Sequence, residues 1–229
     1  DNFGYKVKHC WLMMDKACDL YQKIIKSGKL PTLPEILVKL LEACDDEQRP
    51  LRDVSELISK DPVLSFKVLQ LVNSAYYSLS RNFTSVEEAV VYLGAKSIKN
   101  IAITTAVHQV FEHKRFEKFT HFNTRKFWWH SLLAATLAKR IARKVNYINC
   151  DEAYLSGLLH DIGQMVLLKA FPKEYDSFLG DTARLENIYR AEKQRIGVTH
   201  SQAGAWLVKK WNLNSLMADA IKYHHSHIE

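Results

Sequence analysis

The sequence predicts a nearly all-helical protein without a real sheet, on two observations. Its 229 residues include only eight Gly and five Pro, which is few for a chain built from many turns. Apolar residues recur at the 3.6-residue period of a helix along most of the chain, and no clear alternating run of the strand type occurs. With 47% hydrophobic residues, the chain can bury a substantial core, as one large domain or as two small lobes.

The first predicted helix covers residues 3–27 and is ended by Gly28 and Pro31. Six of its residues form an apolar stripe at heptad spacing: Val7, Trp11, Met14, Cys18, Tyr21 and Ile25. This stripe favours an N-terminal amphipathic helix, residues 1–28, that packs on its own chain. The alternative is a coiled-coil-like seam with a partner, an upstream domain or a second copy. In either case we expect the helix to transmit a signal from upstream.

Residues 29–115 are expected to form a first helical lobe. Pro34 opens its first helix, and the polar run 45–50 closes it. A short helix follows, for which Asp53 is the predicted cap. Asp61 and Pro62 then begin the next helix as cap and first-turn proline.

The end of this lobe carries further helix signals. Ser85 and Glu88 have the spacing of a capping box, and Gly94 should end the helix that they begin. A second helix is expected over residues 95–112. The charged, aromatic segment 113–123 has no clear period, so we place the join between the two lobes there.

Residues 116–229 are expected to form the second lobe. Asp151 is the predicted cap of the helix that leads to His160, and Thr199 stands at the start of another. Residues 171–181 look looser, because Pro and Gly interrupt the pattern. We expect helices over residues 124–145, 151–159, 182–195, 199–211 and 215–225.

The formal charge is +7, from 32 basic and 25 acidic residues. The densest basic stretch alternates with aromatic residues: Lys114, Arg115, Phe116, Lys118, Phe119, Phe122, Arg125, Lys126 and Phe127. Nucleic-acid binding is one interpretation of this pattern. We favour a solvated linker beside core aromatics, because no recognised nucleic-acid motif accompanies the charge.

The four cysteines, Cys10, Cys18, Cys44 and Cys150, have no CxxC spacing and fall in helical patterns. This usage predicts reduced thiols and a cytoplasmic protein. No window reaches the roughly 18 uncharged apolar residues of a membrane span, and the N-terminus lacks the order of a signal peptide. We therefore expect a soluble protein that has no membrane partner.

Five histidines and one aspartate fall at helix positions flanked by apolar residues: His130, His160, Asp161, His200, His224 and His225. A single such histidine is usually a hydrogen-bonded core residue. Six positions on four helices of one lobe are better explained by a shared metal site. Imidazole nitrogens and a carboxylate suit Fe, Mn, Zn or Ni, and a metal bound there could activate water.

The order His, His-Asp, His, His-His resembles the HD superfamily of metal-dependent phosphohydrolases. The first lobe adds four segments that resemble the signature of the HDOD family: Leu-Pro-Thr-Leu-Pro at 30–34, Asp-Pro at 61–62, Leu-Val-Asn-Ser-Ala-Tyr at 71–76 and Ala-Val-Val-Tyr-Leu-Gly at 89–94. The resemblance covers roughly residues 30–227. It implies a two-lobed, all-helical HDOD-type fold with an HD-like C-terminal lobe, in a bacterial cytoplasmic signalling domain.

The chain departs from the related HD-GYP phosphodiesterases. Those enzymes commonly follow the His-Asp pair with Ile-Gly-Lys, and the lysine can meet a substrate phosphate. Here the position is Gln164, whose neutral amide cannot replace that charge. The Gly-Tyr-Pro segment has no counterpart. The sequence also stops four residues after His225, before any later aspartate could contribute, so that either the chain is cut short or the site lacks one ligand.

Two classes of function stay open. The favoured one is a regulatory module that works by binding a signalling partner, an upstream receiver-type domain or a nucleotide, and that can form a homodimer. The alternative is a metal-dependent phosphohydrolase acting on a cyclic dinucleotide or other nucleotide, with Asp161 as the candidate catalytic residue. Nucleic-acid binding comes third.

Overall fold

The computed structural model describes residues 33–46, 48–74, 82–111, 116, 118–181 and 185–226. Within these ranges the secondary structure is helical and contains no strand, which confirms the predicted all-helical fold. The helix predicted over residues 3–27, with its apolar stripe, lies outside the described residues. The chain divides into two compact units, one between Thr32 and Glu112 and the other from His113 to the C-terminal end.

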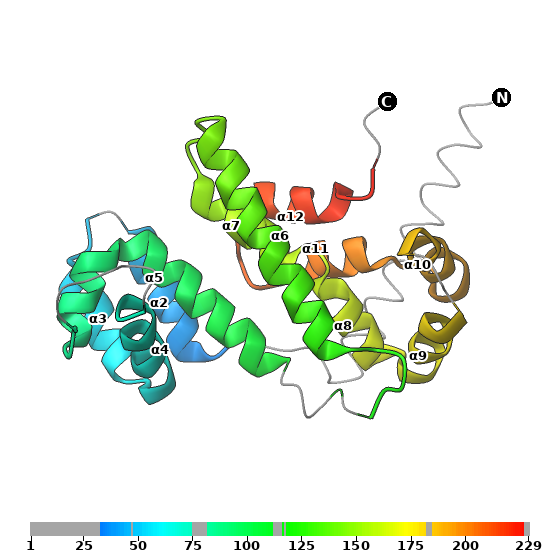
Figure 1. Ribbon diagram of the computed structural model, residues 1–229, viewed down its shortest axis with the longest axis horizontal. Coiled ribbons are helices and arrows are strands. Elements are labelled where there is room, and N and C mark those ends of the chain that lie inside the picture. Colours follow the sequence, from blue (N-terminus) through cyan, green and yellow to red (C-terminus); the bar gives the residue numbers. More distant parts are fainter. Residues whose placement is uncertain are drawn as a thin grey trace. The chain divides into compact units, whose positions relative to one another are not determined.

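The unit between Thr32 and Glu112 is built around one long helix. Helix α5 packs against three shorter helices. The bounds are α2 (Glu35–Asp45), α3 (Leu51–Ser59), α4 (Pro62–Val72) and α5 (Val86–Val110) (Figure 1). Fully buried aliphatic side chains from all four helices, among them Leu40, Ile58, Val68 and Ile98, form the core of this unit.

Most helix boundaries of this unit follow the predicted signals. Asp61 caps α4, because its side chain accepts hydrogen bonds from the backbone N–H groups of Val63 and Leu64. Gly94 interrupts α5 with φ 76° and ψ 160°, a backbone conformation that is nearly restricted to glycine. The prediction for Asp53 is wrong. Helix α3 begins earlier, at Leu51 after Pro50, and the Asp53 carboxylate lies 3.3 Å from Arg49 Nε instead.

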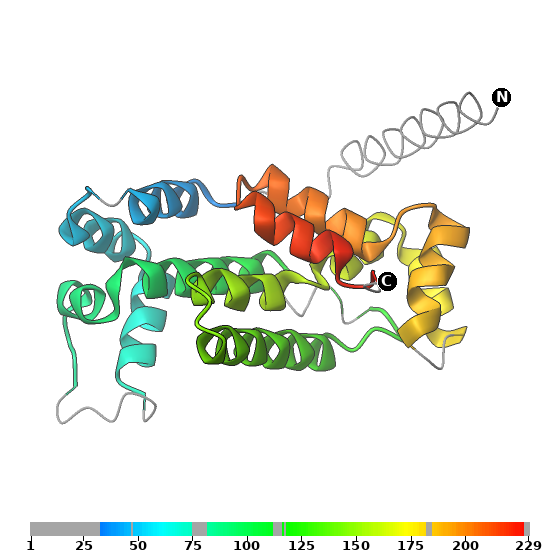
Figure 2. The same ribbon diagram turned by 90° about the horizontal axis from the view of Figure 1, so that it is seen from above.

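The unit from His113 onward contains the remaining helices (Figures 1 and 2). They are α6 (Thr124–Lys144), α7 (Cys150–Leu159), α8 (Ile162–Ala170), α9 (Pro172–Asp181), α10 (Leu185–Ala191), the π-helical turn η2 (Glu192–Ile196), α11 (His200–Lys210) and α12 (Ser215–Tyr223). Helices α6 and α7 pack side by side, as do α11 and α12, while α8 packs against α11 and α7 against α12. The core of this unit therefore lies between α7, α8, α11 and α12.

Two predictions about this unit are corrected. Asp151 is not the cap of α7, which begins at Cys150 after Asn149; its carboxylate instead pairs with Lys139 of α6 at 2.7 Å. The segment predicted to be loose is helix α9. Pro172 occupies the first position of α9, where the missing N–H and the fixed φ of proline are favourable. Tyr175 of this helix is fully buried.

The aromatic residues before and within α6 form a cluster. The Phe116 ring lies 6.0 Å from Phe119 and 6.1 Å from Phe122, and Phe122 lies 5.6 Å from Phe127. Phe116 and Phe127 are buried, as the interpretation of core aromatics beside a charged linker required. None of the helices in the described ranges is long and apolar enough to cross a membrane.

A histidine cluster around Asp161

Close helix packing brings the predicted ligands together. His130 lies on α6, and His160 and Asp161 occupy the break between α7 and α8. Gly157 allows α7 to approach α6, since a Cβ there would lie 2.8 Å from Ala135 Cα. Gly163 does the same for α8 and α11, since its Cβ would lie 2.6 Å from the backbone N of Gly204. These contacts place the break next to His200, the first residue of α11.

Asp161 is the centre of the cluster. Its Oδ2 lies 3.4 Å from the Nε2 atoms of both His130 and His160. Its Oδ1 lies 3.3 Å from His200 Nε2 and 3.5 Å from His224 Nε2. The two oxygens therefore face two different pairs of imidazoles.

The imidazoles also meet one another through Nε2 atoms. His130 and His160 approach to 2.9 Å, His200 and His225 to 2.9 Å, and His200 and His224 to 3.3 Å. Two ligand groups follow from these distances: Asp161 with His200, His224 and His225, and Asp161 with His130 and His160. The fold thus brings all six predicted residues together.

The hydrogen bonds of the other ring nitrogens fix the tautomers. His160 Nδ1 lies 2.8 Å from the carbonyl oxygen of Gly157, and His224 Nδ1 lies 2.7 Å from that of Ile221. A carbonyl oxygen can only accept, so both Nδ1 atoms carry the proton. In the neutral rings the Nε2 atoms then present lone pairs toward the cluster centre. Lone pairs of several rings and a carboxylate facing one another are the arrangement that a bound cation stabilises, so the residues fit a metal ion.

Glu192, the first residue of η2, was not predicted as part of the site. Its side chain is fully buried, although the sequence around it reads as a polar helix. Its Oε2 lies 2.7 Å from both the backbone N and the ring Nδ1 of His200. Its Oε1 accepts a hydrogen bond of 2.6 Å from the Tyr175 hydroxyl. Glu192 and Tyr175 therefore orient His200 so that its Nε2 points at Asp161.

The protonation of the cluster follows from burial and neighbours. Burial alone would raise the pKa of the Asp161 carboxyl, but the facing imidazoles of His224, His160 and His200 lower it well below its ordinary value. Burial would likewise lower the pKa of His200, but the hydrogen bond and charge of Glu192 raise it. Burial is the main cause that lowers the pKa of His160, and that of His225 to about 4.

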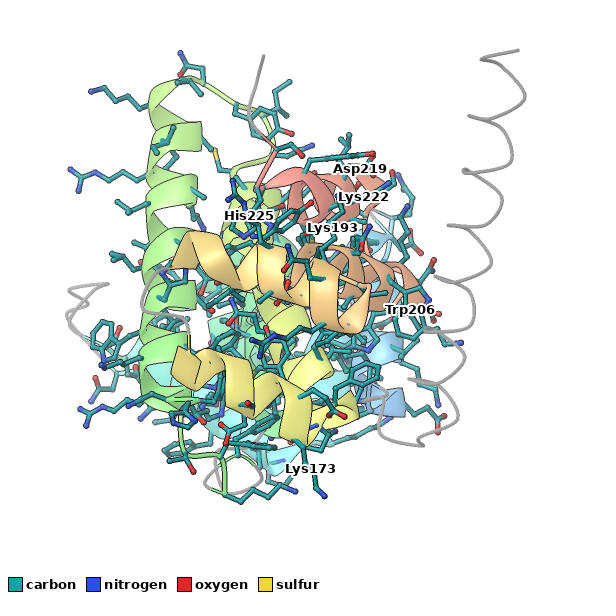
Figure 3. All side chains as sticks on the ribbon, turned by 90° about the vertical axis from the view of Figure 1, so that its right-hand side faces the viewer. Lys173, Lys193, Trp206, Asp219, Lys222 and His225 are labelled. Atoms are coloured by element: carbon teal, nitrogen blue, oxygen red, sulfur yellow. The ribbon has the colours of Figure 1, made fainter. Side chains whose placement is uncertain are left out.

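The cluster is buried on one side and exposed on the other. The side chain of His200 is only 2% exposed, whereas that of His130 is 54% exposed. His225 is also exposed and follows α12, with its ring 5.4 Å from that of Tyr189 on α10 (Figure 3). The cluster is therefore open to solvent at His130 and at His225.

An all-helical unit that gathers His, His-Asp, His and His-His on four segments defines a helical domain of the HD type. The sequence matches the HDOD domain over residues 30–227, and the chain belongs to the HDOD family.

Three relatives describe the similarity. An HDOD domain protein of unknown function from Geobacter sulfurreducens is 33% identical, with a TM-score of 0.71, over 86% of this chain and 65% of that one. A candidate phosphohydrolase from Shewanella amazonensis is 27% identical, with a TM-score of 0.73, over 90% and 71%. An uncharacterized protein of Treponema pallidum is 26% identical over 86% of this chain but only 38% of its own length. The chain thus spans under two thirds of two of these relatives.

Proposed function

We propose that this chain is a regulatory HDOD module that holds a divalent metal ion in the histidine cluster and acts by binding a partner or a ligand. The observation that carries the proposal is the convergence of four imidazole Nε2 atoms on the Asp161 carboxylate, with His225 Nε2 2.9 Å from that of His200. Sites of nitrogen and carboxylate ligands suit Fe, Mn, Zn or Ni. The proposed ligands are His130, His160, Asp161, His200, His224 and His225.

The ligand atoms of the cluster could bind one ion or two. His200, His224, His225 and Asp161 Oδ1 form one group of ligand atoms, and His130, His160 and Asp161 Oδ2 form another. In this proposal Asp161 bridges or orients the metal, and the same ligands tie together the segments from which they come. Glu192 holds the proton of the neutral His200 ring on Nδ1, so that the Nε2 lone pair would face the ion.

A signalling protein, an upstream receiver-type domain or a nucleotide is the proposed partner class. Partners of that kind are implied by the resemblance to HDOD signalling domains, and the relatives that extend well beyond the matched region leave room for further domains. A homodimer and a cytoplasmic location are part of the same proposal.

The alternative is a metal-dependent phosphohydrolase acting on a cyclic dinucleotide or another nucleotide. The exposure of His130 and His225 favours it, because substrate could reach a metal held there. A bound metal would supply an activated water and stabilise negative charge on phosphate oxygens. Gln164 stands against it, since a neutral amide on α8 provides no charge for a phosphate group.

Elemental analysis of protein purified without added metal tests the proposal. We expect stoichiometric metal in the unmodified protein and none in Asp161→Ala, because that change removes the oxygens that face both pairs of imidazoles. Asp219→Ala is the matched control, since Asp219 is an exposed carboxylate on α12 (Figure 3). Unchanged metal content in Asp161→Ala would refute the assignment.

A hydrolysis assay separates the two functions. Metal-loaded protein is incubated with a panel of cyclic dinucleotides and nucleotides. If the chain is a regulatory module, we expect weak hydrolysis of these compounds or none. Turnover above about 1 s⁻¹, an ordinary enzyme rate, would establish the alternative in its place.

A further inference from the structure

Helix α6 carries an apolar surface that no other described helix of its unit covers. Its inward residues, such as Phe127, Ser131, Ala135 and Ala142, are buried. Its outward residues include large apolar side chains: Trp129 is 67% exposed, Leu133 57% and Ile141 60%. Leu132 and Leu137 are exposed as well, and we call these five apolar residues the α6 face. Several large apolar side chains exposed on one side of a helix point to an interaction site.

The α6 segment itself carries charge of one sign only. No Asp or Glu occurs between Glu117 and Asp151. Exposed basic residues stand at both ends of the face, Arg125 and Lys126 before it and Arg140, Arg143 and Lys144 at its end. Lys139 is different, because it is paired with Asp151 of α7. A partner must therefore offer apolar side chains in the middle and negative charge at both ends.

The positions of the basic residues argue against a membrane. At 100° per residue, Arg140 lies about 20° around the helix from Trp129, and Lys144 lies about 20° from Leu133. The charges are thus on the midline of the face. A helix that lies in a bilayer surface instead keeps its basic residues on the polar side of the apolar stripe. Inserting Trp129 and Leu133 into the acyl chains of a bilayer would also bury the charge of Arg140.

The same charges argue against a second copy of this chain. A twofold contact between two α6 faces would bring Arg140 and Lys144 of one copy toward basic residues of the other, and like charges at an interface are costly. The presence of Trp129 and Arg140 and the absence of Asp and Glu match instead the centre of a protein interface, which is rich in Trp and Arg and poor in Asp and Glu.

We propose that the α6 face binds an amphipathic helix of a partner protein, with apolar residues over its middle turns and Asp or Glu at both ends. Such a helix lies along α6, which spans about 31 Å at 1.5 Å per residue. This inference rests on the proposed function in one respect, since a regulatory module needs a partner to act on. Because His130 lies on α6, next to Trp129, the partner would contact a helix that also supplies a proposed metal ligand.

Two model peptides of about 20 residues test this proposal with the full chain. Both carry the same leucine stripe over their middle turns, one with Glu at both ends and one with Lys. Fluorescence anisotropy should detect binding of the Glu peptide and at least tenfold weaker binding of the Lys peptide. Leu133→Ser combined with Leu137→Ser should weaken binding of the Glu peptide at least tenfold. Phe66→Ser, at a 61% exposed position on α4, is the control and should change nothing.

A charge exchange makes the test independent of folding defects. Arg140→Glu combined with Lys144→Glu should weaken binding of the Glu peptide and strengthen binding of the Lys peptide, relative to the unmodified protein, and damage to the fold would not strengthen either. Metal content is measured on the same samples, so failure of the metal site and failure of the α6 face are distinguishable.

Three results would overturn the proposal. The first is that a correctly folded protein does not bind the Glu peptide at about 1 mM, a concentration on the order of the weakest useful dissociation constant. The second is co-sedimentation with phosphatidylglycerol vesicles that the leucine changes abolish. The third is a homodimer that the same changes dissociate.

Discussion

Glu192 binds His200 through both the backbone and the ring, with its Oε2 2.7 Å from each of the two nitrogens. The carboxylate is fully buried, and its other oxygen is held by Tyr175. A carboxylate behind a ligand histidine keeps the ring in one tautomer and strengthens it as a ligand. The contact also fixes the start of α11, so the same residue supports the fold and the proposed metal site.

Glu192→Gln should therefore lower metal affinity by about 10- to 100-fold, the usual effect of losing such a partner. The amide is neutral, so it stabilises positive charge on the His200 ring less well. Titration against a chelator of known affinity measures the change. Glu174→Gln, at an exposed position on α9, is the control. Equal affinities for both variants would show that Glu192 has only a structural role.

Tyr175→Phe separates the hydrogen bond that Glu192 accepts from Tyr175 from its hydrogen bonds with His200. It removes the 2.6 Å bond to the carboxylate and leaves both bonds to His200 in place. We expect a smaller loss of metal affinity than in Glu192→Gln, because Oε1 still lies 2.9 Å from His200 Nδ1. We also expect a loss of stability of about 1 to 3 kcal/mol from the lost hydrogen bond to a buried charged group. Chemical unfolding of metal-free protein measures the second effect. A larger loss of affinity than in Glu192→Gln would contradict the inference that Glu192 contributes more to metal binding than Tyr175 does.

The helical class and the six candidate ligand residues could be predicted from the sequence, but the role of Glu192 could not. His160 and Asp161 stand out because the pair interrupts an apolar run and matches a family order. Glu192 sits between charged and polar neighbours, and its burial depends on contacts with Tyr175 and His200, which are 17 and 8 residues away. No local pattern reports such contacts.

The ends of the helices are likewise only partly predictable from local sequence. Asp61 caps its helix as predicted, and Thr199 caps the helix that it was expected to begin, because their side chains bond to backbone N–H groups within three residues. Asp53 and Asp151 have equally good local signals, yet they pair with Arg49 and Lys139 instead. A basic partner within reach competes with the cap, and Pro50 favours an earlier helix start.

Gly163→Ala should destabilise the protein by more than about 2 kcal/mol, because a Cβ there meets the backbone of α11 rather than a flexible side chain. The shift of α11 needed to relieve the clash would move His200 away from Asp161, so metal content should fall as well. Thermal unfolding and elemental analysis measure the two effects. Gln164→Ala, one position along α8, should change stability by less than about 1 kcal/mol. A stable, metal-replete Gly163→Ala protein would contradict the close helix contact.

Cys44 should react slowly with thiol reagents at neutral pH. Burial, helped by the neighbouring Asp45, raises its pKa to about 11, so only about one molecule in several thousand carries the reactive thiolate at pH 7.5. Mass spectrometry after timed alkylation should show modification of Cys44 only slowly in the native protein and rapidly in urea. Fast native labelling would show that α2 opens readily.

Metal-free protein should lose stability as the pH falls from about 6.5 to 4. The folded state holds the pKa of His225 at about 4 and also lowers that of His160, mainly through burial. In the unfolded chain both rings take up protons near pH 6.5. Protonation therefore favours the unfolded state in this window, and the stability present above pH 6.5 is lost on acidification. His200 acts in the opposite direction, because Glu192 raises its pKa in the folded protein. The contribution of His225 can be isolated with His225→Gln, which should show a shallower loss of stability between pH 6.5 and 4 when unfolding is measured in the presence of a chelator. Parallel curves for the two proteins would mean that His225 protonates equally in the folded and unfolded states, and that its ring is not held against His200 and His224 in solution.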